Sequence, residues 1–163
     1  MQCVLWIYSF RRHARQTTVT YSCDVEIGLP RSRVIELFDD PDNLLKWQPD
    51  LIRFEPLSGT PGRPGATSRL TYRAGKGELE MIETITERDL QDVFSGTYKT
   101  KMGVTEIRNR FIDRGNTTRW IVDTEYKASG MMKILSPFLR GVIRKQTQTV
   151  VDNFKAFAES QAH

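Results

Sequence analysis

A single glutamate interrupts an otherwise apolar row of side chains in the middle of the chain. Glu83 lies between Met81 and Ile85 in a segment that alternates in polarity, so these three side chains would share one face of a β-strand. A carboxylate on such a face loses solvation, which raises its pKa. We therefore identify Glu83 as a candidate general acid or base, or as an anchor for a ligand hydroxyl. A carboxylate that pairs with an arginine, or that lies at the rim of a sheet, fits the same pattern equally well.

An amide and two phenols have similar positions in other segments. Asn109 has apolar residues two positions before and after it, so its side chain can hydrogen-bond to a ligand oxygen or satisfy a buried backbone group. Tyr72 and Tyr98 also occupy alternating, inward-facing positions. Together with Glu83 and Asn109, these phenols would orient the polar end of a ligand.

Other residue types exclude several classes of chemistry. His13 and His163 lie at the ends of the chain, which excludes serine–histidine and cysteine–histidine nucleophiles and histidine-based zinc sites from its body. Cys3 and Cys23 form neither a disulfide framework nor a CxxC motif, and we expect Cys23 to be a small buried residue in a reducing cytoplasm. The glycine-rich segment 59–65 lacks the Gly-Lys-Ser/Thr signature and precedes a strand, so we interpret it as a structural turn. Neither a metal nor a cofactor is expected.

The elements that must position these groups are mostly β-strands. Alternation predicts a strand over 17–27, followed by two short helices at 31–38 and 42–46 and then by further strands. Short turns separate the later strands, which indicates hairpins and an antiparallel meander. The later strands are expected at 51–57, 67–73, 78–87, 92–101, 104–113 and 117–127.

A long amphipathic helix is predicted over 131–160, because apolar residues recur there at steps of three and four. This order of elements predicts an α+β fold, in which a curved seven-stranded antiparallel sheet wraps around the long C-terminal helix and two short helices follow the first strand. Gly96 and Gly103 are the expected points at which the sheet bends. The hollow between the helix and the sheet is the expected binding site.

Alternation also identifies the side chains that would line this hollow. Inward-facing strand residues and apolar residues near the start of the helix would form a mostly apolar wall with a few polar groups. Any one of these aromatic residues could simply fill the core, but as a set they favour a pocket. The predicted ligand-binding residues are Tyr72, Met81, Glu83, Phe94, Tyr98, Asn109, Phe111, Trp120, Leu135, Phe138 and Leu139.

Composition limits the partners of this protein. The chain has 163 residues, of which 39% are hydrophobic, and it can form a core without a disulfide or a metal. Its net charge of +4 includes Arg11, Arg12 and Arg15 in the acid-free segment 1–16, so the rest is nearly neutral and nucleic-acid binding is not expected. We expect segment 1–16 to be an extension, disordered or packed as an extra strand, and residues 17–160 to form one domain. The apolar stretch of this extension is shorter than the roughly 20 residues of a membrane span.

Three motifs connect this chain with a known superfamily. Residues 40–50 contain Asp-Pro followed by Trp-Gln-Pro-Asp, residues 61–67 read Pro-Gly-Arg-Pro-Gly-Ala-Thr, and residues 150–159 read Val-Val-Asp-Asn-Phe-Lys-Ala-Phe-Ala-Glu. With the order of the elements, these motifs resemble the helix-grip (SRPBCC) superfamily of START domains and the birch-pollen allergen. They are most similar to its polyketide cyclase/dehydrase and lipid transport branch. The resemblance extends over about residues 17–160 and implies the helix-grip fold.

The same resemblance implies the binding of a lipid, sterol, quinone or polyketide, since members bind such molecules and only some are enzymes. Cyclases of this superfamily use an arginine and tyrosines inside the cavity. Here alternation assigns Arg69, Arg73, Arg108 and Arg110 to outward faces, although a register shift of one residue would bring Arg108 inward.

The sequence leaves three functions open. The first is binding or transport of a small hydrophobic ligand in the cytoplasm by a monomer or homodimer, with transient contact between residues 131–137 and a membrane surface. The second is a cofactor-free polyketide cyclase or dehydratase that uses Glu83. The third is a protein-interaction or assembly module that uses the exterior of the sheet, where no apolar patch is obvious.

Overall fold

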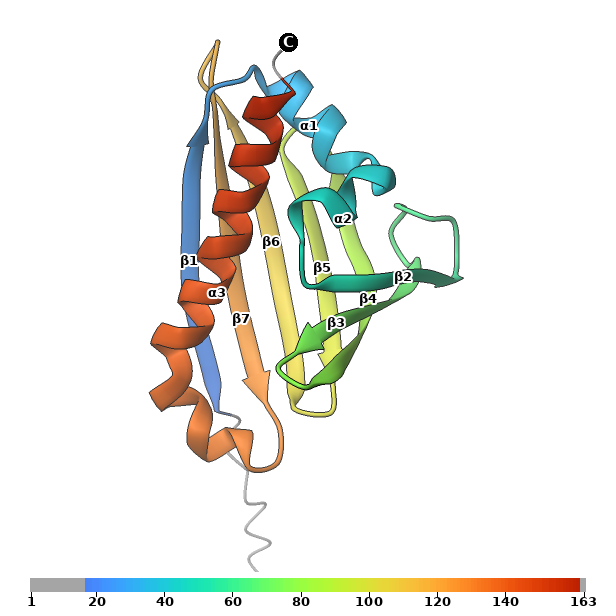
Figure 1. Cartoon of the computed structure of the whole chain (residues 1–163), viewed down its shortest axis with the longest axis vertical. Helices are drawn as coiled ribbons and strands as arrows, with labels where there is room; N and C mark the ends of the chain where they lie inside the picture. The colour runs from blue at the N-terminus through green and yellow to red at the C-terminus, as the bar shows by residue number, and fades with distance from the viewer. Residues whose placement is uncertain (1–16, 162–163) are drawn as a thin grey trace, which may run out of the picture.

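The computed structural model describes residues 17–161, so the predicted extension 1–16 lies outside the described part of the chain (Figure 1). The described residues form a seven-stranded sheet, two short helices and one long helix, which confirms the predicted α+β helix-grip fold. Predicted and observed boundaries differ by at most two residues. The helical elements are α1 (Arg31–Asp39), the 3₁₀ turn η1 (Pro41–Asn43), α2 (Leu44–Trp47) and α3 (Met132–Ser160). The strands are β1 (Thr18–Ile27), β2 (Leu51–Ser58), β3 (Thr67–Ala74), β4 (Gly77–Asp89), β5 (Val93–Thr100), β6 (Gly103–Asp113) and β7 (Thr118–Ala128).

The strands pair in the order β1-β7-β6-β5-β4-β3-β2, and every neighbouring pair is antiparallel. The pairing of β4 with β5 shifts just after Ile85, and Gly96 lies opposite that residue. A β-carbon on residue 96 would lie 3.2 Å from the Thr84 carbonyl oxygen, so glycine permits this close approach. β2 and β3 cross the direction of β6 and β7 (Figure 1), which gives the sheet its strong curvature.

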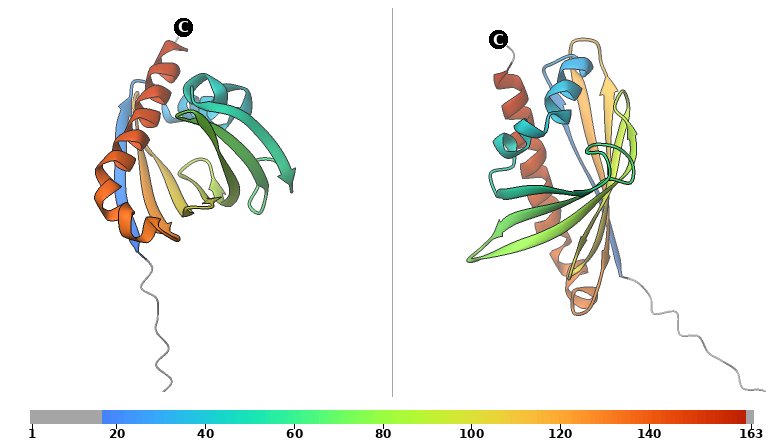
Figure 2. Two further views of the ribbon diagram at one scale, coloured as in Figure 1. Left: turned by 60° about the horizontal axis from the view of Figure 1, so that its bottom comes forward. Right: turned by 90° about the vertical axis from the view of Figure 1, so that its right-hand side faces the viewer.

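The sheet has an inner face, which packs against α3 and the short helices, and an outer face, which does not (Figure 2). Along β7, the inner face carries buried residues at every second position, whereas the intervening residues are partly exposed. The outer face carries mostly charged and small polar side chains. Because side chains alternate along each strand, the register of the strands assigns every residue to one of these faces.

α3 lies along β1, which is an edge strand of the sheet (Figure 1). Three side chains on one side of α3 donate hydrogen bonds to alternate backbone carbonyls of β1, which have no strand beside them. This arrangement protects the edge from pairing with another chain. The donors and acceptors are Arg144 with Ser22, Gln148 with Asp24, and Lys155 with Glu26.

The core lies between the C-terminal half of α3, the short helices and the inner face of β6 and β7. Phe38 of α1 lies at the centre of an aromatic cluster, and edge-to-face contacts dominate its packing. Cys23 is a buried free cysteine beside this core, as predicted. The ring centroid of Phe38 lies 6.0 Å from Trp47, 5.7 Å from Phe94, 5.1 Å from Phe111, 5.6 Å from Trp120 and 5.7 Å from Phe154.

Candidate functional site

Tyr72, Glu83 and Tyr98 come from the neighbouring strands β3, β4 and β5, and all three lie on the inner face. Glu83 pairs directly with Tyr98. The register continues from Tyr98 through Thr105 to Tyr126, which is buried on the inner face of β7. Since directly paired residues of an antiparallel sheet have side chains on the same face, the register assigns Glu83 to the inner face as predicted.

The hydroxyl groups of the two tyrosines have defined partners. Tyr98 donates a hydrogen bond from Oη to Glu83 Oε1, with a length of 2.8 Å. Tyr72 donates from Oη to Gln48 Oε1, with a length of 2.7 Å. Gln48 lies between α2 and β2, so the helical segment also contributes to the site. Sequence reasoning did not select Gln48 as a site residue. Its place in the Trp-Gln-Pro motif, which was used there only to recognise the fold, could have drawn attention to it.

The environment of Glu83 disfavours its charged form. Burial raises the pKa of the Glu83 carboxyl, and the hydrogen bond from Tyr98 offsets part of this increase. Burial also raises the pKa of Tyr72 and of Tyr98, and the nearby Glu83 carboxylate raises both further. Within residues 17–161, no lysine or arginine is among the groups that shift the pKa of Glu83. The alternative of an arginine-paired carboxylate therefore does not describe this site.

Apolar side chains surround the three polar ones. Met81 and Ile85 lie two positions before and after Glu83 on β4, and Leu70 of β3 pairs with Met81. Leu70 and Ile85 are buried, whereas Met81 and the three polar side chains are each partly exposed. This part of the inner face therefore keeps some contact with solvent, unlike the core.

The helix does not close this region as the sequence predicted. Leu135, Phe138 and Leu139, which were expected to form its helical wall, are 42%, 83% and 37% exposed. In this half of α3 the buried position is Ser136. These three side chains are exposed because α3 turns small and polar side chains toward β1, as in the 3.0 Å hydrogen bond between Tyr21 Oη and Thr147 Oγ1.

Three other predicted ligand contacts lie in the closed core. Phe111 and Trp120 are 1% and 3% exposed, and their rings stack with centroids 6.1 Å apart. Asn109 accepts a hydrogen bond from Trp120 Nε1 and donates one to the Phe94 backbone oxygen, each at 3.1 Å. Protein groups therefore satisfy both the oxygen and the nitrogen of the Asn109 amide. This arrangement agrees with a structural role for Asn109 and does not require a ligand. Phe94 packs against the aromatic cluster but keeps some exposure.

The arginines that alternation assigned to outward faces are on the outer face. Arg108 forms an ion pair with Glu87, and Arg110 forms one with Asp123. Arg88 is different, because the shift in register after Ile85 places it opposite Phe94 on the inner side. Its guanidinium is nevertheless occupied by Asp39 of α1, with hydrogen bonds of 2.7 and 2.6 Å. On the inner face of residues 17–161, no arginine is therefore free to act on a ligand.

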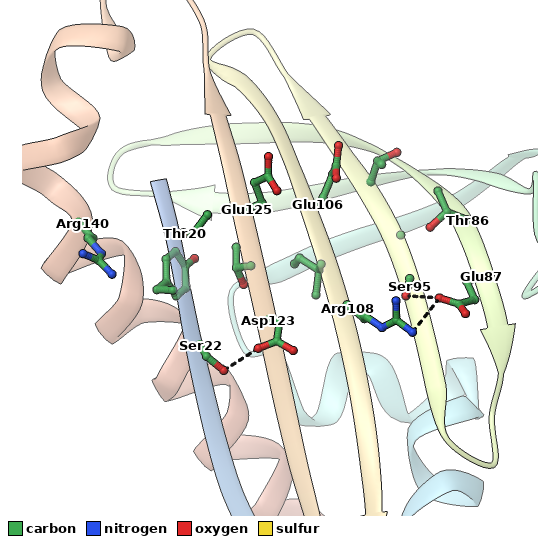
Figure 3. A pocket seen from close by; sticks show the side chains of 15 residues that line it. Thr20, Ser22, Thr86, Glu87, Ser95, Glu106, Arg108, Asp123, Glu125 and Arg140 are labelled. Atoms are coloured by element: carbon green, nitrogen blue, oxygen red, sulfur yellow. Dashed lines mark hydrogen bonds and ion pairs between the residues drawn. The ribbon is translucent and has the colours of Figure 1, made fainter. Parts of the chain in front are cut away.

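A shallow groove of about 800 Å³ lies on the outer face and extends across β1, β7, β6, β5 and β4 (Figure 3). Many of its polar side chains bind one another: Arg108 lies 3.6 Å from Glu87, and Ser22 donates to Asp123 at 2.8 Å. The lining is mixed, and its four acidic residues outnumber its two arginines. This groove is on the opposite side of the sheet from Glu83, and sequence reasoning did not identify it.

In the range 17–161, no group of three histidine, cysteine or acidic side chains is arranged to hold a metal ion. Among the helices of this range, none has both the length and the apolar character needed to cross a bilayer.

Sequence comparison connects the chain with one family. Residues 16–159 match the sequence profile of the family described as polyketide cyclase/dehydrase and lipid transport. A search of curated protein sequences gave no match.

Comparison with solved structures identifies many proteins of the same fold. An aromatase/cyclase, Zhui from Streptomyces sp. R1128, is similar with a TM-score of 0.76 and 12% identity, covering 90% of this chain and 96% of that one. A START superfamily protein from Mycobacterium smegmatis has a TM-score of 0.73 and 14% identity, covering 86% and 97%. Norcoclaurine synthase from Thalictrum flavum, in complex with dopamine and hydroxybenzaldehyde, has a TM-score of 0.69 and 14% identity, covering 100% and 99%. At these identities the likeness concerns the fold.

Proposed function

The chain belongs to the polyketide cyclase/dehydrase and lipid transport family of START-like helix-grip proteins, and we propose that it binds a small hydrophobic molecule against the inner face of its sheet. The observation that carries this proposal is the Glu83–Tyr98 pair, which lies partly exposed among apolar side chains. A few polar groups on an apolar surface are the usual composition of a small-molecule site.

The free energy of binding would come mainly from the apolar part of the ligand. Removing apolar surface from water contributes about 25 cal/mol per Å². Met81 and the exposed parts of Tyr72 and Tyr98 supply protein surface for this contact. Leu135, Phe138 and Leu139 would complete the site on the helical side, since their exposed apolar surfaces remain available to a bound molecule.

The polar end of the ligand would lie at Glu83, Tyr72 and Tyr98, which define one polar position within the apolar region. We place this binding in the cytoplasm, where a free thiol such as that of Cys23 stays reduced. Phe111, Trp120 and Asn109 are not needed for ligand contact in this proposal, because the core encloses them.

Fluorescence titration with N-phenyl-1-naphthylamine, an uncharged apolar probe, tests the proposal. Two neighbouring residues of β4 provide a matched pair of variants: Met81 faces inward, whereas Ile82, which pairs with Lys99, faces outward. We expect saturable binding to the wild-type protein, weaker binding to Met81→Gln and unchanged binding to Ile82→Gln. Circular dichroism of both variants checks that they fold.

Two results would contradict the proposal. The first is the absence of saturable probe binding to the folded wild-type protein. The second is equal loss of binding in Met81→Gln and Ile82→Gln, since an inward-facing site requires the two faces of β4 to differ.

A second candidate is a cofactor-free cyclase or dehydratase, which the raised pKa of Glu83 favours. In the dehydration of a β-hydroxy ketone, the Glu83 carboxylate would accept a proton from the carbon beside the carbonyl. The resulting carboxyl would return that proton to the departing hydroxyl, so that a carbon–carbon double bond and water form. Turnover of a β-hydroxy ketone that falls to background in Glu83→Gln supports this role, and equal turnover by the variant rejects it.

A further inference from the structure

The hydrogen atoms of the two phenols at the site are already committed to protein acceptors. A tyrosine hydroxyl has one hydrogen to donate. Tyr98 donates its hydrogen to Glu83, and Tyr72 donates its hydrogen to Gln48. The lone pairs of both phenolic oxygens remain, and they can only accept.

Glu83 adds a further acceptor. Tyr98 binds Oε1, and Oε2 has no protein donor among the hydrogen bonds of residues 17–161. Ser68 is the residue directly opposite Glu83 on β3, but it is buried and so is not presented to solvent. Glu83, Tyr72 and Tyr98 therefore offer oxygen acceptors to a ligand, whereas the amide nitrogen of Gln48 beside Tyr72 is a donor.

The negative charge of Glu83 also favours a ligand that donates hydrogen bonds. Glu83 forms no ion pair with a lysine or arginine in the described range. Tyr98 is the titratable group that shifts the pKa of Glu83, and Glu83 in turn raises the pKa of both Tyr72 and Tyr98. A partly buried carboxylate without a cationic neighbour is stabilised by any cation that binds beside it.

We propose that the ligand bound here carries a head group that donates hydrogen bonds, an ammonium or a hydroxyl, and not a carboxylate, phosphate or isolated ketone. This inference rests on the proposed function, because it specifies the polar end of the molecule bound at that site. An anionic head would be repelled by Glu83, and a ketone would place its acceptor against acceptors.

A series of ligands with one hydrocarbon chain and different heads tests this assignment. Displacement of N-phenyl-1-naphthylamine near neutral pH by 1-octylamine, 1-octanol and octanoate compares a cation, a neutral donor and an anion. We expect 1-octylamine to displace the probe at a concentration about tenfold or more below that of octanoate, with 1-octanol between them.

Glu83→Gln should remove most of the advantage of 1-octylamine, because it removes the charge while keeping an oxygen acceptor for Tyr98. Glu80→Gln is the matched control, since Glu80 lies three residues earlier on β4 and is exposed. Octanoate binding as tightly as 1-octylamine would overturn the head-group assignment and leave the proposed function standing. Absence of binding by the probe and by all three ligands would instead contradict the proposed function.

A second inference comes from the start of α3, which includes the helical side of the proposed site. Six large apolar side chains between positions 131 and 142 are exposed there. Every charged residue between 129 and 151 is basic, and the first acid that follows is Asp152. These apolar residues, which we call the apolar patch, are Met131, Ile134, Leu135, Phe138, Leu139 and Val142.

We infer that the apolar patch docks on an anionic membrane surface. An amphipathic helix binds an interface through its apolar face and through attraction between its basic residues and anionic lipids. Here Lys133, Arg140 and Lys145 supply that charge. The same charges disfavour a second copy of the chain as the occupant, because a symmetric contact would bring like charges together.

Sedimentation with vesicles tests this inference on the full chain. We expect binding to phosphatidylcholine vesicles that contain about 30% phosphatidylglycerol, and much weaker binding to phosphatidylcholine alone. Phe138→Gln should weaken binding about tenfold, whereas Leu45→Gln, a control at an exposed leucine of α2, should not.

Equal binding by Phe138→Gln and wild type would overturn the membrane inference. A dimer of the wild-type protein that dissociates in Phe138→Gln would also overturn it, by assigning the apolar patch to a second copy. Sedimentation velocity without vesicles makes this second comparison.

Discussion

The Tyr98 hydroxyl donates a 2.8 Å hydrogen bond to Glu83, its direct partner across β4 and β5. This bond favours the carboxylate, while burial favours the carboxylic acid, and burial dominates. The sheet therefore holds Glu83 in an environment that a cation or a proton would stabilise. A raised pKa of this kind is one mark of a candidate functional site.

Removing the Tyr98 hydroxyl should raise the pKa of Glu83 further. Tyr98→Phe removes the hydrogen bond that stabilises the carboxylate and leaves the burial unchanged. Tyr72→Phe is the matched control, because the Tyr72 hydroxyl is bound to Gln48. Carbon-13 NMR titration of the glutamate carboxyl groups measures both effects. A pKa of Glu83 that stays the same or falls in Tyr98→Phe would contradict the assigned bond.

Glu83 should make the folded protein less stable as the pH rises. Its pKa in the folded state is above the ordinary value of 4.5, so the folded state keeps this proton when the unfolded chain has released it. The contribution of Glu83 to the free energy of unfolding is therefore fully present below pH 4.5 and is lost as the pH rises through the folded pKa.

Glu83→Gln should remove that pH dependence. We expect the Tm of the variant to exceed that of wild type near neutral pH, and the difference to shrink in acid. Thermal unfolding at a series of pH values measures it, with Glu80→Gln as the control on the same strand. A Tm of Glu83→Gln below that of wild type at neutral pH would show that the carboxylate is stabilising.

Two phenylalanines of α3 should differ strongly in their effect on stability. Phe154 is fully buried in the aromatic cluster, whereas Phe138 is exposed. Phe154→Ala should lower the free energy of unfolding by about 3–5 kcal/mol, while Phe138→Ala should change it by less than about 0.5 kcal/mol. Urea unfolding of both variants gives these values, and similar values for the two would contradict the packing of α3.

Asn109 should be a structural residue. Asn109→Leu leaves Trp120 Nε1 without its acceptor and removes the side-chain hydrogen bond to the Phe94 backbone oxygen, which should cost about 1–3 kcal/mol of stability. Probe affinity, measured below the temperature at which the variant unfolds, should remain at the wild-type value. An unchanged Tm together with lost probe binding would reverse this assignment and restore Asn109 as a ligand contact.

Alternation along the strands was sufficient to predict the fold and the face of the central polar residues. Glu83 and Tyr98 share a face because each lies at an inward position of a regular stretch, and their pairing needs no irregularity. Arg88 could not be placed in this way, because a β-bulge after Ile85 changes its face and leaves no mark in the polarity pattern. Gln48 was missed for a related reason, since its contact with Tyr72 depends on how a loop meets the sheet.

The helix shows the limit of periodicity more clearly. Leu135 and Phe138 share an apolar stripe with Phe154 by spacing, but the structure buries only Phe154. Periodicity identifies an apolar stripe and does not state which part of it meets the sheet. Along the first half of α3, contact with the β1 edge through Arg144 and Thr147 decides the orientation of the helix.

NMR titration with N-phenyl-1-naphthylamine tests most directly whether the inner face is the binding site. Met81 and Ile82 are adjacent on β4 and face opposite sides of the sheet, so their methyl groups report the two faces separately. We expect saturable ring-current shifts of the Met81 methyl and of the Glu83 side chain, with little change at Ile82. Saturable shifts at Ile82 without shifts at Met81, or no saturable shifts at either residue, would contradict this account.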